Sequence, residues 1–382
     1  MHLAIVNLTN GGMSGGYRKY LDQMIPRLAG DTRIGRIDLL SPADVPDLPQ
    51  FSEVASHQTW PATDKLVGFP AMHRMLHKLN ADVVLVPTAR SVDPNHAAFV
   101  AMVRNMEPLL PNVPGHPPFE RIVNFARRRA AHQACRTADL IIAVSDFVKQ
   151  RVVDRFGVDV SRIRRVYHGV DPIVGARATI PASLPSPPPE QFLFVAGSIR
   201  PMRGIQDAIG ALAILKDRWP QLTLVIAGEM EGKVGSWTKR LKSLVQEHGL
   251  TERVYWTGRL NADAMSWCFQ HCAAFLMTSR MEACPNIALE AMSFGATIIS
   301  NSNPPMPEFF GDSAIYYPAG DATRAAESVD AVLSQSSVDV SDRNLLARRR
   351  AQDFTWDRCA AETIEVLLES RRAASNGNSR SA

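Results

Sequence analysis

The stretch that decides the fold reads Ser279-Arg280-Met281-Glu282-Ala283-Cys284-Pro285-Asn286-Ile287-Ala288-Leu289-Glu290-Ala291-Met292-Ser293-Phe294-Gly295. Apolar runs at 273–277 and 296–300 flank it and are typical of short buried strands. We expect a helix to begin near Pro285, since proline suits the first turn, and to end at Gly295. Strand, loop, helix and strand in this order predict a βαβ unit.

Two glutamates bracket the start of this helix. Glu282 falls in the loop at the carboxyl end of a strand, where open α/β sheets bind their ligands. Glu290 lies one to two turns into the helix, on a face that can look toward the same place. Acids near a helix start also suit the helix dipole in any α/β domain. The two glutamates therefore indicate a ligand site only together with the residues around them, which are small residues, Pro-Asn and a terminal glycine.

Bulk composition narrows the class of protein. The 382 residues favour two domains, and 46% hydrophobic with 21% charged residues is ordinary for a soluble globular protein. No apolar run reaches membrane-spanning length and the first residues read as a strand, so we expect a cytoplasmic protein. Five scattered cysteines indicate buried free thiols rather than a zinc site. A net charge of +4 without a nucleic-acid motif argues against a nucleic-acid partner.

The first half of the chain opens with a strand at 2–9, a glycine-rich loop and a helix at 17–28. Gly15 and Gly16 close that loop, which brings backbone N–H groups close to a phosphate or a sugar. The loop is not G-x-G-x-x-G, so plain dinucleotide binding is a weak interpretation. A merely tight turn would explain one or two glycines better than four.

A basic surplus marks the region 121–165, which holds eleven Lys and Arg against four Asp and Glu. Much of it falls on a predicted amphipathic helix at 120–137. Two interpretations stay open. The surplus is either a solvated surface or an attraction to anionic lipid headgroups on the inner face of a membrane, at about 1 kcal/mol per well-placed basic residue.

We predict domain boundaries from composition. Five prolines between 181 and 189 indicate an extended, semi-rigid segment. We place the N-terminal domain at 1–175, a Pro-rich linker at 176–190 and the second domain at 191–354. A last helix follows at 355–370, and the Ser-, Asn- and Arg-rich residues 371–382 are expected to be disordered.

The stretch 279–295 resembles the Glu-x7-Glu signature of the retaining nucleotide-sugar glycosyltransferases of family 4, the group 1 glycosyl transferases. The resemblance covers nearly the whole chain, and it is weakest at 31–120. It implies an α/β fold of the GT-B class, with two Rossmann-like domains whose parallel sheets face a central cleft. It also implies that the C-terminal helix crosses back to the N-terminal domain.

The resemblance assigns the donor site. Arg203 stands where the family has a lysine on the donor pyrophosphate, but Ser198 stands where it has an arginine, and Arg200 is a substitute candidate. Glu282 would lie near the donor sugar and Glu290 on the ribose. The remaining implied donor contacts are Gly15, Gly16, Gly228, Arg259, Leu260, Asn286 and Ile287.

The acceptor side departs from the family. Where many members have a His-Asp pair, this chain has Asn105 with Glu107 nearby, and Asn105 can hydrogen-bond a hydroxyl but cannot act as a general base. The general base therefore stays unnamed. His168 is expected to shape the turn between the domains rather than to catalyse.

The implied reaction moves a hexose from a nucleoside diphosphate sugar to a saccharide or lipid-linked acceptor, with retention of the anomeric configuration. A role in bacterial surface polysaccharide or glycolipid synthesis fits the family. No Asp-x-Asp pair occurs, so we expect no metal requirement and no cofactor. A nucleotide-sugar epimerase or hydrolase, and a non-catalytic sugar-nucleotide-binding subunit, remain as alternatives.

Overall fold

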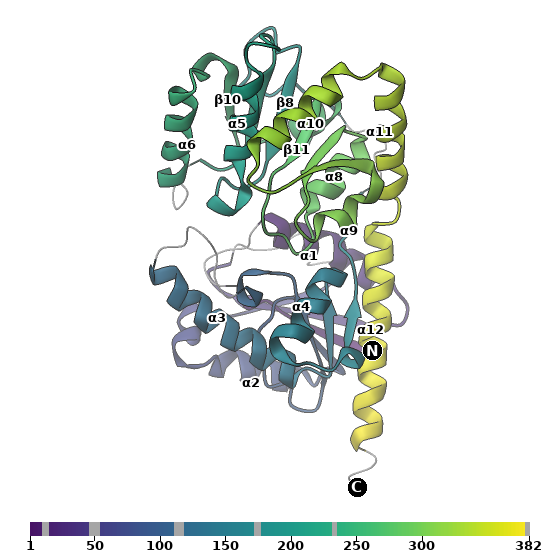
Figure 1. Cartoon of the computed structure of the whole chain (residues 1–382). Helices are drawn as coiled ribbons and strands as arrows, with labels where there is room; N and C mark the ends of the chain where they lie inside the picture. The colour runs from purple at the N-terminus through teal and green to yellow at the C-terminus, as the bar shows by residue number, and fades with distance from the viewer. Residues whose placement is uncertain (10–14, 46–53, 111–117, 172–176, 231–234, 379–382) are drawn as a thin grey trace. The chain divides into compact units, whose positions relative to one another are not determined.

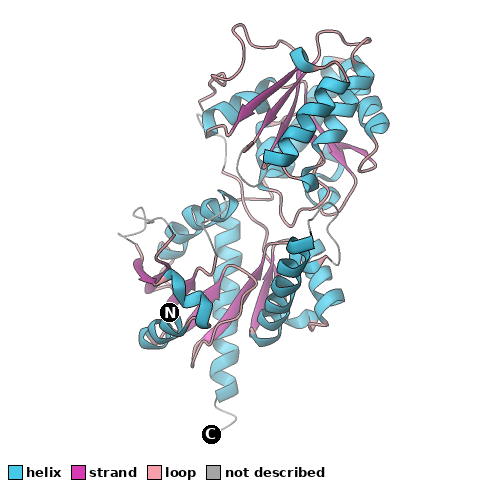
Figure 2. Ribbon diagram, turned by 90° about the vertical axis from the view of Figure 1, so that its left-hand side faces the viewer, coloured by secondary structure: helices cyan, strands magenta, loops and turns pink. Residues whose placement is uncertain are grey.

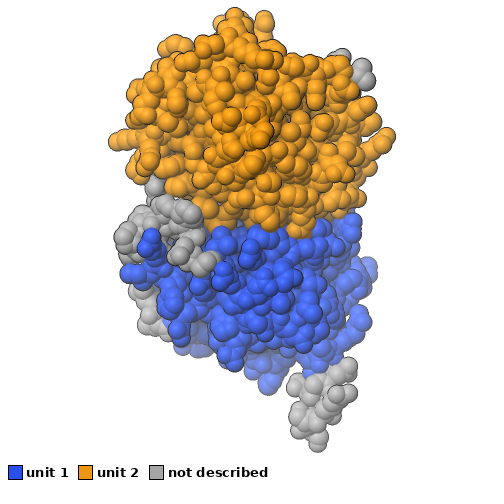
Figure 3. Space-filling view, viewed as in Figure 1, with its two compact units in different colours: residues 1–112, 116–169, 356–382 blue, residues 113–115, 170–355 orange. Residues whose placement is uncertain are grey.

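The fold is built on two sheets, and all the strand pairs in both sheets are parallel. The computed structural model describes residues 1–9, 15–45, 54–110, 118–171, 177–230 and 235–378. The chain divides into two compact units, one of residues 1–112, 116–169 and 356–382 and the other of residues 113–115 and 170–355 (Figure 3). Each unit contains one sheet, and helices lie on both sides of the strands (Figures 1 and 2).

The sheet of unit 1 has the strand order β3-β2-β1-β4-β5-β6-β7. Its strands are β1 (His2–Val6), β2 (Arg36–Pro42), β3 (Ser56–Trp60), β4 (Val83–Val86), β5 (Ala98–Val103), β6 (Leu140–Ala143) and β7 (Ile163–Arg165). Its helices are α1 (Gly15–Ala29), α2 (Pro70–Leu79), α3 (Pro118–Thr137), α4 (Asp146–Phe156) and α12 (Trp356–Asn378). The order of the sheet reverses between β1 and β4, which is the doubly wound pattern with its switch point there.

The sheet of unit 2 repeats this pattern in the order β10-β9-β8-β11-β12-β13. The strands are β8 (Phe192–Ala196), β9 (Thr223–Ala227), β10 (Val254–Gly258), β11 (Ala274–Met277), β12 (Ile298–Asn301) and β13 (Ala314–Tyr317). The helices are α5 (Ile205–Leu215), α6 (Gly235–Glu247), α7 (Ala262–His271), α8 (Asn286–Phe294), α9 (Met306–Phe310), α10 (Ala322–Ser334) and α11 (Ser337–Ala351). Here the order reverses between β8 and β11.

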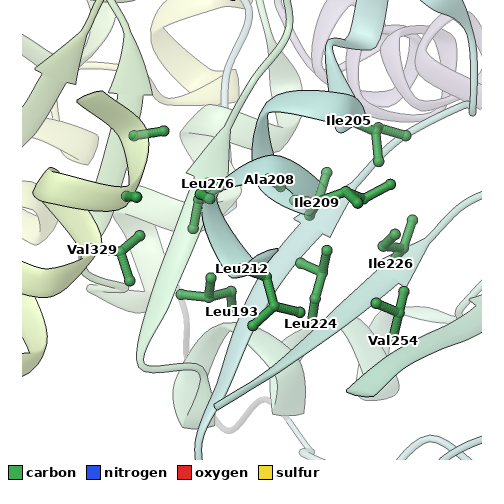
Figure 4. Packing of buried hydrophobic residues seen from close by; sticks show 14 of the residues in the cluster. Leu193, Ile205, Ala208, Ile209, Leu212, Leu224, Ile226, Val254, Leu276 and Val329 are labelled. Atoms are coloured by element: carbon green, nitrogen blue, oxygen red, sulfur yellow. The ribbon is translucent and has the colours of Figure 1, made fainter. Parts of the chain in front are cut away.

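The core of unit 2 explains why its strands read as continuous apolar runs. A parallel sheet covered on both faces buries every strand residue, so alternation disappears. Leu212 of α5 lies over Leu193 and Leu224, and all three side chains are fully buried (Figure 4). Each such leucine stabilises the fold by about 1.5–3 kcal/mol relative to an exposed one. This packing holds the carboxyl ends of β8 and β11 at one edge of the sheet.

The last helix belongs to unit 1, as the resemblance implies. Trp356 at the start of α12 is 1% exposed and its ring meets that of Tyr20 edge-on at 6.3 Å. Arg27 Nε donates to the Asp357 carboxylate at 2.7 Å, and Arg371 lies 3.2 Å from Asp82 further along the helix. The expected disorder from 371 is not found at residues 371–378, which continue α12, and Arg371 at the start of this stretch still contacts Asp82 of unit 1.

The division between the units differs from the predicted linker at 176–190. It falls between Gly169 and Val170. The Val170 N–H donates to the Phe354 carbonyl at 2.9 Å, and Val170 forms a bridge with Thr355. Further on, the Thr179 N–H donates to the Asp263 carbonyl at 3.2 Å. The proline-containing segment is therefore hydrogen-bonded into unit 2, because backbone groups outside a regular element still need partners.

Candidate active site

The loop that follows β8 carries Arg203. It turns through a short 3-10 helix, Pro201–Arg203, and enters α5 at Gly204. Gly204 has φ +62°, and a Cβ at this position would lie 2.2 Å from the carbonyl oxygen of Thr278. Only glycine permits this approach. The sequence thus allows the β8 loop to lie directly against the loop after β11.

Hydrogen bonds join these two loops at the switch point of unit 2. The Thr278 hydroxyl donates to the Arg203 carbonyl at 2.6 Å, and the Arg280 N–H donates to the Met202 carbonyl at 2.8 Å. Asn301, the last residue of β12, donates from Nδ2 to the Ser279 carbonyl at 2.8 Å. The backbone of 278–282 is therefore fixed on two sides.

Arg203 and Glu282 form an ion pair across these loops, through Nη1 and Oε1. The Arg203 side chain is 29% exposed and that of Glu282 is 12% exposed. The Arg203 guanidinium also lies beside Gly197, since a Cβ placed there would be 3.6 Å from its Cζ. The structure thus brings together two predicted site residues that are 79 positions apart in the chain.

A buried carboxylate fixes the loop that carries Glu282. Asp207 of α5 is 2% exposed, accepts from Arg280 Nη2 at 2.9 Å and accepts from the Gly320 N–H at 2.9 Å. It therefore connects α5 with the loops after β11 and β13. Sequence reasoning missed both Asp207 and Arg280. The available signal was the one charged residue in the mostly apolar stretch Ile205–Leu215, although nothing in the spacing identifies its partners.

Helix α8 presents its amino end at the same edge of the sheet. Pro285 precedes it, no acidic side chain lies in its first turn, and Asn286 and Ile287 are its first residues. At the other end the Gly295 N–H, at φ +65°, closes the helix, and Arg348 donates to the Phe294 carbonyl at 3.2 Å. Glu290 follows one turn after Asn286. The amino end of a helix carries the positive end of the helix dipole, which attracts an anion.

Other predicted donor residues lie along the neighbouring strands. A Cβ on Gly228 would be 2.0 Å from the Gly197 carbonyl oxygen, and its N–H donates to the Gly258 carbonyl at 2.8 Å. Arg259 is exposed directly after β10, and Leu260 is partly exposed. These residues follow β9, which neighbours β8, and β10, which neighbours β9, so they extend the same edge.

Ser198 and Arg200 are the other two predicted donor-site residues of the loop after β8. Ser198 is partly exposed. Arg200 is exposed, and its carbonyl accepts the Arg203 N–H at 2.9 Å. The backbone of Arg200 therefore forms the turn that presents Arg203, while its own side chain lies at the surface.

The predicted residues of unit 1 occupy the edge of the other sheet. Gly15 and Gly16 are the first residues of α1, and the rest of their loop, 10–14, lies outside the described residues. The Asn105 side chain accepts the Glu107 N–H at 3.1 Å, and Glu107 pairs with Arg127 at 2.8 Å. The Asn105 side chain thus takes part in a local turn and the Glu107 side chain pairs with α3, neither of which the sequence pattern indicated.

His168 lies in an aromatic cluster. It is 3% exposed, and its ring centroid is 5.8 Å from that of Trp356 and 5.4 Å from that of Tyr20. This packing fits the expectation that His168 shapes the chain where the first unit ends.

The described residues contain neither a candidate membrane-spanning helix nor a candidate metal site. In the part of the chain that the structure describes, no helix is both long and apolar enough to cross a membrane. Within the same ranges, no group of three or more His, Cys, Asp or Glu side chains has the arrangement of a metal site.

The fold and the edge geometry define a class. Two Rossmann-like domains, with seven-stranded and six-stranded parallel sheets, match structures of GT-B glycosyltransferases. Sucrose-phosphate synthase from Thermosynechococcus elongatus has a TM-score of 0.77 at 18% identity, over 97% of this chain and 99% of that one. Anabaena HepE in complex with UDP-glucose has a TM-score of 0.76 at 16% identity, over 97% and 100%.

Family models then identify the family. "Glycosyltransferase Family 4" matches residues 15–173, and "Glycosyl transferases group 1" matches residues 176–350. The chain therefore belongs to the group 1, family 4 glycosyltransferases.

Curated relatives agree with this family. Glycogen synthase of Mycobacterium tuberculosis is 26% identical over 239 residues, which cover 62% of this chain and 56% of that protein. D-inositol 3-phosphate glycosyltransferase of Salinispora tropica is 27% identical over 262 residues, covering 64% and 54%. The chain spans little more than half the length of these relatives.

Proposed function

We propose that this protein transfers a hexose from a nucleoside diphosphate sugar to a saccharide or lipid-linked acceptor, with retention of the anomeric configuration. The observation that carries the proposal is the Arg203–Glu282 pair at the switch point of unit 2, next to the amino end of α8. A cation and the positive end of a helix dipole suit a diphosphate. The UDP-glucose complex of the similar Anabaena protein supports a nucleotide-sugar donor.

In this proposal each residue of the site has a separate role in donor binding or transfer. Arg203 and the first amides of α8 stabilise the charge that develops on the departing diphosphate, as preorganised dipoles do. The acceptor hydroxyl attacks from the same face, and a leaving phosphate oxygen takes its proton. Glu282 orients the donor sugar and Glu290 accepts from the ribose hydroxyls. Because Arg203 supplies the positive charge, we propose that transfer needs neither a metal nor another cofactor. Activity that chelator abolishes and manganese restores would contradict this.

Thermal unfolding with UDP, GDP and ADP tests the donor class. A nucleotide that binds only the folded state raises the unfolding midpoint by mass action. The nucleotide that stabilises the protein then identifies the sugar nucleotides for assay with candidate acceptors. Release of free sugar or of an epimer without any acceptor would favour the hydrolase or epimerase instead. No stabilisation by any of the three would reject the proposal.

We also propose that the protein works at an anionic membrane surface on the cytoplasmic side, where lipid-linked precursors of surface polysaccharides or glycolipids are made. Helix α3 carries the supporting observation. Ile122 and Phe125 are 70% and 59% exposed, and the Arg129 guanidinium lies 5.9 Å from the Phe125 ring. Spacings of three and four residues place these side chains on one helical face. Arg121 and Arg136 are also exposed.

A vesicle-pelleting assay tests this surface. We expect pelleting with phosphatidylglycerol vesicles at low salt, little pelleting with phosphatidylcholine, and weaker binding after Ile122→Ser and Phe125→Ser. Val160→Ser is the matched control, because Val160 is 55% exposed on a different element of unit 1. Protein that stays in the supernatant with anionic vesicles would exclude the membrane role and leave α3 as a solvated surface.

A further inference from the structure

Unit 1 has its own switch point, between β1 and β4. Ile5 of β1 pairs with Leu85 of β4. Asn7 and Thr88 follow these positions by two and three residues, and Arg90 follows Thr88. All three therefore lie at the carboxyl edge of two adjacent parallel strands, where open α/β sheets bind ligands.

Asn7 holds a buried donor with no acceptor. Its side chain is fully buried, and its Oδ1 accepts the Thr9 N–H at 3.0 Å and the Thr9 hydroxyl at 2.8 Å. These two donors fix the orientation of the amide, so Nδ2 must point the other way. In the described structure Nδ2 meets no hydrogen-bond acceptor. A buried donor in this state is destabilising unless a ligand supplies the acceptor.

The next strand adds two more donors. The Thr88 hydroxyl is buried and has no hydrogen-bond partner among the residues described. The Arg90 N–H donates to the Thr88 carbonyl at 2.8 Å, which folds the loop back on itself. Arg90 is partly buried, and no ion pair of its guanidinium occurs in the described ranges.

Charge at this edge favours an anion. Burial lowers the pKa of Arg90, and the nearby positive charge of Arg127 lowers it further. Glu107 pairs with Arg127 at 2.8 Å, and Asn124 accepts from the same guanidinium at 3.1 Å. A partly buried guanidinium is stable when a negative charge lies beside it, and among the described residues no carboxylate pairs with Arg90. An oxyanion would supply that negative charge.

We propose that Asn7, Thr88 and Arg90 form an oxyanion subsite for the acceptor, so that the acceptor carries a phosphate or a carboxylate. An amide N–H, a hydroxyl and a guanidinium together match the oxygens of such a group. The assignment to the acceptor rests on the proposed function, in which Arg203 and α8 of unit 2 already bind the donor diphosphate. Oxyanion binding by unit 1 does not depend on it.

The test measures thermal unfolding of the full-length protein in sodium phosphate or sodium acetate, each against sodium chloride at equal ionic strength. We expect one of the two anions to raise the midpoint saturably, and the comparison identifies the group. Arg90→Gln should weaken that anion's apparent affinity about tenfold to a hundredfold, as expected for lost hydrogen bonds to a charged group. Arg74→Gln, which removes an exposed arginine of α2 in the same unit, should change nothing.

Further variants cover misfolding and the second source of an anion. If circular dichroism shows that Arg90→Gln is unfolded, the Thr88→Val variant tests the subsite instead. Valine keeps the shape of threonine and removes one hydrogen-bond donor, so we expect weaker anion binding. The stabilising nucleoside diphosphate should bind wild type and Arg90→Gln equally. An equal loss of nucleotide affinity would assign the oxyanion to the donor and overturn the acceptor subsite. Equal effects of phosphate, acetate and chloride on the wild type, or unchanged affinity in the variants, would also overturn it.

Discussion

The ion pair between Arg203 and Glu282 makes a specific prediction about donor binding. In the structure the two side chains neutralise each other, and both are largely shielded from water, at 29% and 12% exposure. A diphosphate that binds Arg203 must compete with the Glu282 carboxylate. Glu282→Gln removes the competing charge with little change of shape. We therefore expect tighter nucleoside diphosphate binding together with loss of transfer.

The size of the effect follows from the exposure of the pair. Two unit charges in contact near a protein surface attract by about 4 kcal/mol at an effective dielectric constant of 20. Solvation and side-chain entropy reduce the net worth of such a partly exposed pair to about 1 kcal/mol. Removal of that competition should tighten binding about fivefold. Transfer should fall because Glu282 no longer orients the donor sugar.

Titration calorimetry with the nucleoside diphosphate that stabilises the protein measures the change. Glu252→Gln is the matched control, because it removes one exposed acid from the short 3-10 helix Thr251–Arg253 of the same unit. Its affinity should equal that of the wild type. Nucleotide affinity that is unchanged or weaker in Glu282→Gln would refute the competition, and full transfer activity would show that the predicted site is misplaced.

Two further predictions concern stability. Gly204→Ala should cost about 2–4 kcal/mol, from the positive φ and the overlap with the neighbouring loop carbonyl; Gly249→Ala, at φ +68° with open space around it, should lower the thermal midpoint much less. Burial would raise the pKa of Asp38, but hydrogen bonds from Arg36 and His2 outweigh it and hold the pKa below its ordinary value. A lowered carboxyl pKa stabilises the fold above the unfolded value of about 4 and loses this effect as pH falls through the folded value. Asp38→Asn should therefore reduce stability at neutral pH and differ less from wild type below about pH 4, which urea midpoints between pH 2 and 7 can measure.

Elements with strong local signals were predictable. The helix from Pro285 to Gly295 is found at Asn286–Phe294, because a proline before the first turn and a left-handed glycine after the last one mark its ends in any context. The strand β3 was missed. Its first four residues, Ser56–Thr59, are polar and partly or fully exposed at the edge of the sheet, so the strand lacks the apolar run that marked the other strands.

Membership of the candidate site was predictable for residues that belong to a motif, but the contacts between them were not. Glu282 and Arg203 were expected at one site, yet their direct pairing was not, since the loops meet only through the close approach at Gly204. Asp207 has no motif, and its role comes from the loops after β11 and β13, which both donate to this buried carboxylate of α5. The unsatisfied donor of Asn7 is likewise invisible in the sequence, because a missing partner is a property of the packed structure.

The amino-acid sequence by itself determined the α/β class, the order of the strands along the chain, and the residues 279–295 around which the donor site is predicted. These depend on local periodicity and on glycine and proline at helix ends, which act over a few residues. Only the tertiary structure decided which side chains meet at the two switch points and which contacts hold the last helix on unit 1. Those outcomes depend on sheet order and on contacts between segments tens to hundreds of residues apart, and no local pattern encodes them.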